Sequence, residues 1–285
     1  MAITYNNLYL DIRRQLKAAG VESAQLEARE LVCHAAGKSR EEFYRDLPLY
    51  ASAEVEGKVE ALLQRRLAGE PAPYLIGEWE FYGLTLEVTP DVLIPRMDTE
   101  LLAERAILLA RAAGAGARVL DLCTGSGCVG LAVAANVPDC RVVLADVSEG
   151  ALAVCGRNIR RCGLLSSAVP LSADALRPPP PALWDFDIIT CNPPYIPTGD
   201  LAGLDPEVRK FEPRLALDGG ADGLNFYRAV TAHWGKALRR GGSLLFEVGI
   251  GQAGPVKDLM AAQGFSQIQA HQDTAGIWRV LEGQI

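Results

Sequence analysis

From Arg118 onward, short apolar runs alternate with segments of helical spacing, and this alternation constrains the fold more than any other feature of the sequence. The expected strands cover residues 119–122, 141–145, 169–172, 186–191, 243–248, 265–270 and 277–281. The expected helices between them cover residues 128–135, 151–161, 223–240 and 256–263. Such alternation is typical of an α/β fold, a mostly parallel sheet with helices on both faces. Because only a short loop separates the last two strands, we expect one antiparallel edge strand in this seven-stranded sheet.

Residues 1–70 instead show helical spacing of apolar side chains throughout. Ser39 followed by Glu42 matches the capping box that begins many helices, and a last helix is expected at residues 52–67. The region has neither a glycine-rich loop nor a cluster of catalytic residue types. The sequence therefore predicts a small helical N-terminal domain that binds a partner or acts as a lid.

Residues 71–97 form the expected connection between two domains. Within them, residues 78–88 alternate aromatic and β-branched side chains with polar ones around a central glycine, which is typical of a β-hairpin. We expect this hairpin to link the helical domain to a second domain at residues 98–285. Asp98 or Thr99 is expected to cap the first helix of that domain.

The composition excludes several classes of protein. Hydrophobic residues make up 49% of the 285 residues and charged ones 22%, which is typical of a globular chain. A net charge of −7, with basic residues in pairs but never in longer runs, argues against nucleic-acid binding. No signal peptide or apolar membrane-spanning stretch is found. Seven cysteines without Cys-x-x-Cys spacing and only three histidines argue against a metal site. We expect a cytoplasmic protein from a reducing compartment, and nothing requires more than a monomer.

The motif Asn192-Pro193-Pro194-Tyr195 directly follows the expected strand at residues 186–191. Two prolines end the strand, because neither can continue the ladder or start a regular helix there. The resulting rigid loop presents a side-chain amide, main-chain carbonyls and an aromatic ring. An amide oxygen beside a fixed carbonyl can accept both hydrogens of an –NH2 group. Asn-Pro is also a common turn start, so the motif alone leaves a purely structural role open.

Three further features follow expected strands. Residues 123–127 form a glycine-containing loop after the first strand, Asp146 ends the second, and Asp174 lies two residues past the third. An open parallel sheet binds its ligand beyond the carboxyl ends of its strands. Asp146 could hold both hydroxyls of a ribose, and Asp174 could accept from an adenine amino group. A single acid at a strand end is usually a turn residue, but acids at successive strand ends beside a glycine loop favour a nucleotide-like ligand.

Residues 125–130 also match G-x-G-x-x-G, and Asp146 follows at about the distance found in dinucleotide folds. In those folds the first glycine follows the strand immediately, whereas here Asp121 ends the strand and the glycines come later. This longer loop with an acid at its root suits a ligand with a cationic amino-acid end and no pyrophosphate. The glycine match is therefore the only sequence feature that favours a nicotinamide-dependent oxidoreductase.

Residues 121–127 together with Asp146 resemble the S-adenosylmethionine site of class I methyltransferases. Residues 192–195 resemble the branch of that superfamily that methylates amino groups. More specific resemblance, to the HemK/PrmC family of peptide chain release factor glutamine methyltransferases, comes from residues 81–83, 93–100 and 212–220. It covers nearly the whole chain. The resemblance implies a Rossmann-like class I methyltransferase fold, with residues 98–285 as the S-adenosylmethionine-dependent domain.

This resemblance implies methyl transfer from S-adenosylmethionine to the side-chain amide nitrogen, N5, of a glutamine in the Gly-Gly-Gln loop of release factors. Residues 123–127 would wrap the methionine end of the cofactor, Asp146 would hold the ribose, and Asp174 with Ala175 would border the adenine. The Asn192 oxygen and the Pro193 carbonyl would bind the substrate –NH2, with Tyr195 packed against it. The complete set of candidate residues is Asp121, Cys123, Thr124, Gly125, Ser126, Gly127, Asp146, Asp174, Ala175, Asn192, Pro193, Pro194 and Tyr195.

The chain departs from the family pattern at two positions. Cys123 stands where many relatives have glycine, and Met97 where they often have proline. A cysteine fits the loop if its φ is negative, so this departure bears on the detailed shape of the loop.

Two other functions share parts of this pattern. A DNA or RNA amino-methyltransferase would need the same pair of acceptors for an exocyclic –NH2. The net negative charge and the lack of a target-recognition domain argue against this function. A non-catalytic cofactor-binding scaffold would require Asn192 to be only a turn residue.

Overall fold

The computed structural model describes residues 3–285, and the chain divides into two compact units, Met1–Gly77 and Glu78–Ile285. The first unit therefore includes residues 71–77, which the sequence assigns to the linker. Each unit has its own hydrophobic core. In residues 3–285, every helix is too short or too polar to cross a bilayer. The same residues contain no cluster of three or more metal-ligating side chains.

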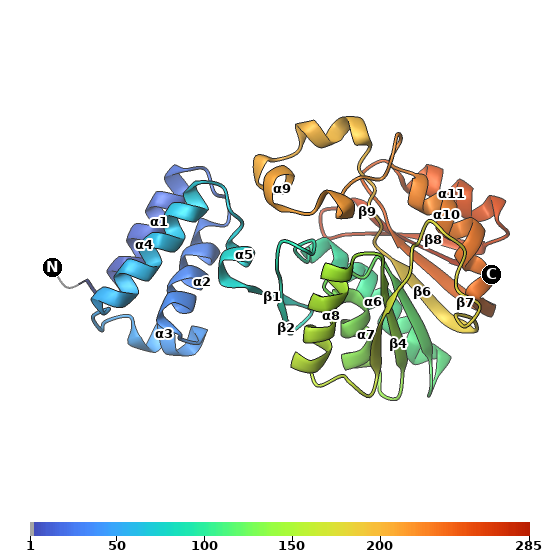
Figure 1. The fold of residues 1–285 in the computed structure, drawn as a ribbon, viewed down its shortest axis with the longest axis horizontal. Helices are drawn as coiled ribbons and strands as arrows, with labels where there is room; N and C mark the ends of the chain where they lie inside the picture. The colour runs from blue at the N-terminus through green and yellow to red at the C-terminus, as the bar shows by residue number, and fades with distance from the viewer. Residues whose placement is uncertain (1–2) are drawn as a thin grey trace. The chain divides into compact units, whose positions relative to one another are not determined.

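The first unit is a helical bundle, as expected (Figure 1). Its helices are α1 (Tyr5–Ala18), α2 (Ala24–Ala36), α3 (Arg40–Asp46), α4 (Ala53–Leu67) and α5 (Ala72–Ile76). Their inward faces bury apolar side chains at helical spacing, among them Ile12, Leu16, Leu31 and Leu63. Complete burial of such a side chain contributes about 1.5–3 kcal/mol.

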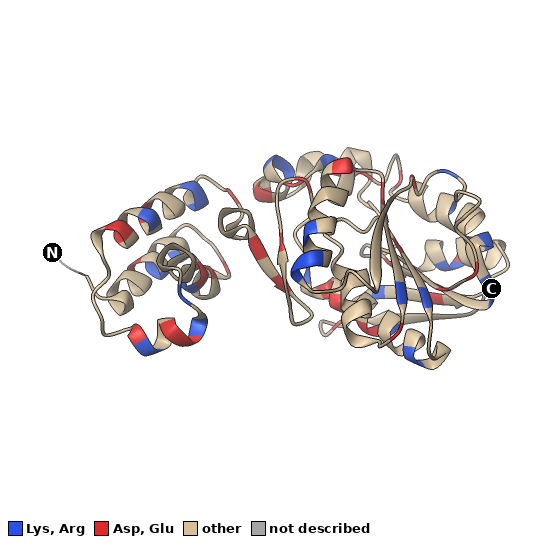
Figure 2. Ribbon diagram, turned by 60° about the horizontal axis from the view of Figure 1, so that its bottom comes forward, with Lys and Arg blue, Asp and Glu red and all other residues tan. Residues whose placement is uncertain are grey.

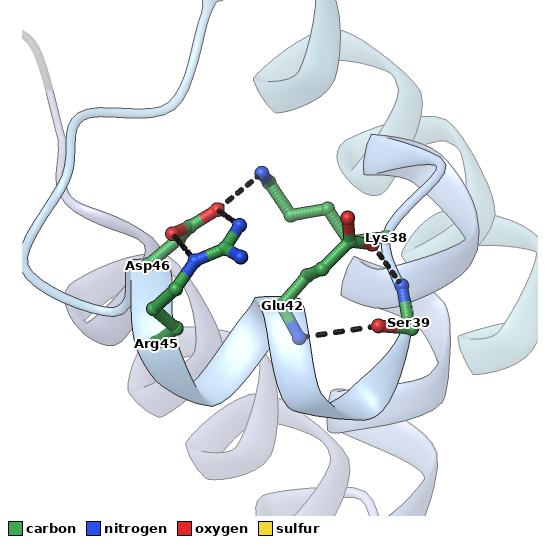
Figure 3. Close-up of polar contacts among 5 residues, drawn as sticks. All are labelled: Lys38, Ser39, Glu42, Arg45 and Asp46. Atoms are coloured by element: carbon green, nitrogen blue, oxygen red, sulfur yellow. Dashed lines mark hydrogen bonds and ion pairs between the residues drawn. The ribbon is translucent and has the colours of Figure 1, made fainter.

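Polar contacts define both ends of α3 (Figure 3). At its start, Ser39 Oγ accepts from the Glu42 N–H at 3.1 Å and Glu42 Oε2 accepts from the Ser39 N–H at 2.9 Å, which confirms the capping box. At its end, the buried Asp46 carboxylate accepts from Lys38 Nζ at 2.7 Å and from Arg45 Nε at 2.8 Å. These bonds, that from Arg45 foremost, hold the pKa of Asp46 well below its usual range. Asp46 thereby connects the end of α3 to Lys38, in the short segment between α2 and α3.

The second unit begins with the expected β-hairpin, made of antiparallel β1 (Glu78–Phe81) and β2 (Leu84–Glu87). The strands of its sheet are β3 (Arg118–Leu122), β4 (Arg141–Asp146), β5 (Ala168–Ser172), β6 (Phe186–Cys191), β7 (Leu238–Glu247), β8 (Ser266–Gln272) and β9 (Trp278–Gln284). Its helices are α6 (Glu100–Ala113), α7 (Cys128–Asn136), α8 (Glu149–Arg161), α9 (Pro206–Phe211), α10 (Asn225–His233) and α11 (Ala253–Ala262). Short 3-10 helices are η1 (Met97–Thr99), η2 (Thr198–Gly203), η3 (Arg214–Ala216) and η4 (Trp234–Ala237). The pattern did not indicate α9, η2 or η3.

The seven strands are ordered β5-β4-β3-β6-β7-β9-β8. All neighbours from β5 to β7 pair in parallel, whereas β9 is antiparallel to both β7 and β8, so the expected antiparallel pair at one edge is confirmed. The direction of strand order reverses between β3 and β6. Because Leu122 pairs with Cys191 there, the loops that follow these two strands begin side by side. Ligands bind at such a switch point in open parallel sheets.

Helices cover both faces of the sheet (Figure 1). On one face α6, α7 and α8 pack with Val119 and Leu245 in one core, and on the other α10, η4 and α11 pack with Leu120 and Leu244 in a second core. Neighbouring residues of one strand thus enter different cores, because successive side chains of a strand point to opposite faces. This explains why the parallel strands are apolar without alternation.

One expected element boundary is wrong. The helix predicted for residues 223–240 ends at His233, and η4 follows it. Strand β7 already begins at Leu238, which pairs with Phe186, and a register shift follows before Ser243 pairs with Ile188. Residues 238–240 are too few to show a period, so pairing with β6 decides their structure.

Candidate functional site

The loops after β3, β4, β5 and β6 line one pocket of about 250 Å³ at the carboxyl edge of the sheet. The pocket brings together most of the residues singled out in the sequence: Asp121, Cys123, Thr124, Gly125, Ser126, Asp146, Asp174, Ala175, Asn192 and Pro194. Three other candidates, Gly127, Pro193 and Tyr195, do not line it. Four segments far apart in sequence therefore meet because parallel strands end at a common edge.

Asp121 is buried beneath the glycine-containing loop, and its two carboxylate oxygens accept three hydrogen bonds. Oδ2 accepts from Thr124 Oγ1 at 2.5 Å and from the Gly130 N–H at 3.2 Å, and Oδ1 accepts from Thr190 Oγ1 at 2.7 Å. Burial raises the pKa of Asp121 to about 6 against the opposing effect of these bonds. Asp121 thus stabilises the loop through hydrogen bonds on its buried side.

The loop itself turns sharply at its first residue. Cys123 has a φ of +56°, so it does not have the negative φ at which a cysteine would fit the loop without strain. The left-handed conformation turns the chain out of β3, and the Thr124 N–H then donates to Ala145 O of β4 at 3.1 Å. Cys123 Sγ lies 4.0 Å from Cys191 Sγ, at the end of the neighbouring strand. Glycine adopts this conformation without strain, whereas an L side chain costs about 1–2 kcal/mol.

Asp146 joins the loop to the next strand end. Its Oδ2 accepts from the Gly125 N–H and its Oδ1 from the Ser148 N–H, each at 2.9 Å. Burial raises the pKa of Asp146. A carboxylate has about four acceptor positions, so Asp146 retains acceptor capacity after these two bonds.

Asp174 and Ala175 lie two and three residues past the end of β5. Asp174 Oδ1 accepts from the Leu176 N–H at 2.8 Å, and the side chain remains partly exposed. The buried Ala175 uses its carbonyl to accept from Trp234 Nε1 at 3.1 Å. These contacts fix the turn that borders the pocket.

The side-chain amide of Asn192 is hydrogen-bonded to Thr99, a residue of η1. Its Nδ2 donates to Thr99 Oγ1 at 3.3 Å. Within residues 3–285, neither Asn192 Oδ1 nor the Pro193 carbonyl accepts a hydrogen bond. Thr99 is at the start of α6, as expected, but its side chain caps no N–H of that helix. The oxygen of the Asn192 amide, which can accept hydrogen bonds, is therefore without a donor in the described residues.

Tyr195 is fixed on several sides. Its carbonyl accepts from Gln252 Nε2 at 2.9 Å, and its hydroxyl lies 3.5 Å from Glu247 Oε1. Burial raises the pKa of Tyr195 to about 12. Glu247 ends β7 and is 3% exposed, and burial raises its pKa to about 7.

The segment at residues 212–220 packs along the Asn192–Tyr195 loop. The Ile196 N–H donates to Leu217 O at 3.0 Å, and the Gly219 N–H donates to Ile196 O at 2.8 Å. At its start, the buried Glu212 accepts from Arg96 and from the Ile94 N–H. The motifs at residues 93–100 and 212–220 are therefore hydrogen-bonded to each other, and each also contacts the segment at residues 192–196.

Thr99 lines the pocket, and Glu212 and Glu247 contact residues beside it, but the sequence assigned none of the three to the site. Two of them lie in the motifs that carry the family resemblance, and Glu247 is an acid at the end of an apolar strand. These signals mark the residues without indicating which side chains they contact.

Known proteins resemble this chain over both units. Residues 7–77 match a family model described as the PrmC N-terminal domain, and residues 98–202 match one described as the methyltransferase small domain. A release factor glutamine methyltransferase of Geobacter sulfurreducens is 43% identical over 275 residues, which cover 96% of this chain and 94% of the relative. The protein of that name from Thermodesulfovibrio yellowstonii is 37% identical over 256 residues, which cover 90% of each chain.

A solved structure also shares the fold. The hMettl16 catalytic domain in complex with a MAT2A 3′UTR hairpin has a TM-score of 0.57 and 16% identity, over 71% of this chain and 76% of that one. At this identity the likeness shows the fold alone. The fold expected from the sequence is confirmed, and the G-x-G-x-x-G match at residues 125–130 belongs to a methyltransferase fold.

Proposed function

The chain belongs to the release factor glutamine methyltransferases, and on this premise we propose that it transfers a methyl group from S-adenosylmethionine to N5 of a release-factor glutamine. The fold and the family imply a methyl-donor cofactor. The glutamine of a Gly-Gly-Gln loop is the target implied by the family resemblance. The observation that carries the proposal is that Asn192 Oδ1 and the Pro193 carbonyl accept no hydrogen bond within residues 3–285.

The pocket suits S-adenosylmethionine by the chemistry of its lining. Asp146 retains acceptor capacity for the ribose hydroxyls, and Asp174 with Ala175 would border the adenine. Residues 123–127 would surround the methionine end. Asp121 would act through the loop, because its oxygens already accept three bonds. When bound, the cofactor supplies a methyl group activated by a sulfonium.

Asn192 and Pro193 would position the substrate amide. Its nitrogen is a poor nucleophile, because the lone pair is delocalised into the carbonyl. Asn192 Oδ1 and the Pro193 carbonyl would each accept one hydrogen and direct the lone pair toward the methyl group, with Tyr195 packed beside them. These acceptors would also stabilise the positive charge that develops on nitrogen. No general base is needed before the transfer.

The partner is proposed to be a protein. Figure 2 shows Lys and Arg interspersed with Asp and Glu over the helices and strands, and the net charge is −7. Nucleic-acid methyltransferases depend on basic surfaces, so this distribution supports release factors over DNA or RNA. We assign partner binding to the helical unit and propose a monomeric, cytoplasmic enzyme.

The test is transfer of labelled methyl from S-adenosylmethionine to an unmethylated release factor. Asn192→Ala should lower kcat by about 100-fold, as expected for one lost transition-state hydrogen bond. Asn136→Ala, at the end of α7, is the matched control and should leave the rate unchanged. A release factor with its loop glutamine changed to alanine should take up no label. Wild-type turnover by Asn192→Ala, or label on RNA instead of protein, would contradict the proposal.

A further inference from the structure

The Thr99 hydroxyl does not cap α6, although Thr99 occupies the N-cap position. It accepts instead from Asn192 Nδ2, 93 residues away in sequence. Thr99 is only 2% exposed, so this bond is largely shielded from water. Thr99, at the start of α6, therefore forms its side-chain hydrogen bond with the Asn192–Tyr195 loop and not with its own helix.

The orientation of the Asn192 amide matters for the proposed chemistry. The two ends of a carboxamide have almost the same shape, but one only donates and the other only accepts. An amide turned by 180° would present N–H groups to the N–H groups of the substrate. A threonine hydroxyl can donate or accept, so Thr99 alone would tolerate either orientation.

Glu247 is the buried acceptor that would remove this ambiguity. The Thr99 hydroxyl is the first of the hydrogen-bonding groups that lower the pKa of Glu247, while burial raises it. Glu247 Oε2 is buried and accepts no bond of ordinary geometry within residues 3–285. Above its pKa of about 7 the ionised carboxylate only accepts, so its buried and unpartnered Oε2 would take up the single hydroxyl proton of Thr99. Thr99 Oγ1 would then only accept from Asn192.

We propose that Thr99 and Glu247 are positioning residues that keep Asn192 Oδ1 facing the substrate amide. This proposal rests on the proposed function, because it assigns a direction to the acceptor that the methyl transfer needs. It extends the site from the Asn192–Tyr195 loop to the end of β7 and to the start of α6.

The test compares Thr99→Val with Thr99→Ser in the full-length enzyme. Valine keeps the shape and removes the hydroxyl, so kcat should fall by about tenfold, as for one lost buried hydrogen bond. Serine restores the hydroxyl and should restore kcat. Because Thr99 also lines the pocket, kcat is measured at saturating cofactor, so that a change in cofactor affinity does not affect it. Thr231→Val is the matched control, since its buried hydroxyl bonds to Tyr227 O within α10.

Glu247→Gln should also lower kcat, because a glutamine N–H can donate to Thr99 and allow the amide to turn. In the Thr99→Val background it should cause no further loss, since both changes break one chain of bonds. Wild-type kcat in Thr99→Val, or independent losses in the double variant, would overturn the proposal.

A second readout does not depend on methyl transfer. The Asn192 side-chain amide signal in a ¹⁵N NMR spectrum, assigned as the one lost in Asn192→Ala, should shift in Thr99→Val and Glu247→Gln but not in Thr231→Val. An unshifted signal would overturn the positioning role even in an active enzyme. Absence of transfer by the wild type, with the expected shifts, would instead contradict the proposed function.

Discussion

At the scale of single residues, the site places carboxylates where their charged form is costly. Glu247 and Asp121 are both nearly inaccessible to water, and burial is the largest cause of each raised pKa. Their hydroxyl partners, Thr99 and Tyr195 for Glu247, offset part of that cost. Such groups make the free energy of unfolding depend on pH, because the folded and unfolded chains bind protons differently.

Glu247 has a folded-state pKa of about 7, above the value of about 4.3 for an unfolded chain. Between these values the folded protein binds more protons, so this group lowers stability as pH rises, by up to about 1.4 kcal/mol per pH unit. In Glu247→Gln this part of the slope should disappear between about pH 4.5 and 7. Denaturant unfolding at several pH values measures it. Glu104→Gln, an exposed site on α6, is the control. An unchanged slope in Glu247→Gln would contradict the prediction.

At the scale of elements, the segment at residues 212–220 keeps the Asn192–Tyr195 loop in place through its main chain. A Cβ at Gly219 would lie 2.8 Å from Pro194 O and from main-chain atoms of Tyr195. The close approach explains why this position needs glycine without requiring a left-handed conformation. The two segments therefore act as one element at the site.

Gly219→Ala should destabilise the protein by about 1–3 kcal/mol, since backbone must move to admit the methyl group. It should also reduce methyl transfer strongly, because the displaced backbone carries Asn192. Gly203→Ala, with no atom within 4 Å of the added Cβ, is the matched control. Unfolding curves and labelled-methyl assays on both variants measure the effects. Equal behaviour of the two variants would show that the close approach is unimportant.

At the scale of the whole molecule, chemistry and partner recognition are assigned to separate units. Every residue that lines the pocket lies between Asp91 and Phe226, within the second unit. The first unit has its own core and a buried ion pair, in which Arg66 Nε of α4 donates to Glu27 Oε2 of α2 at 2.5 Å. Damage to this pair should therefore be separable from cofactor binding.

Arg66→Met should destabilise the helical unit by about 3–5 kcal/mol, because it leaves the Glu27 charge buried without its partner. Arg65→Met is the control, since Arg65 pairs with Glu70 at the surface and such pairs contribute little. Circular dichroism during unfolding measures the difference. Calorimetry should give an unchanged affinity for S-adenosylmethionine. A stability loss no larger than that of Arg65→Met would contradict the role of the pair.

The sequence by itself determined the sheet, the helices on its faces and the loops in which most pocket residues lie. This was possible because apolar periodicity, prolines and glycines report local backbone structure and burial. The sequence also indicated the family, through motifs such as residues 192–195. Its error was local, at residues 238–240, where three residues hold no period. Nor could it show the left-handed conformation of Cys123, which accompanies a bond between the Thr124 N–H and Ala145 O of the neighbouring strand.

Only the tertiary structure decided how the site residues contact one another. Thr99 has the pattern of a helix cap, yet packing brings its hydroxyl to Asn192, and Glu247 becomes its neighbour only when β7 lies beside β6. Local periodicity contains no information about a hydrogen bond between residues 93 apart in the chain. Such a bond depends on strand order, register and burial together, because these place the donor and the acceptor within 3.3 Å of each other.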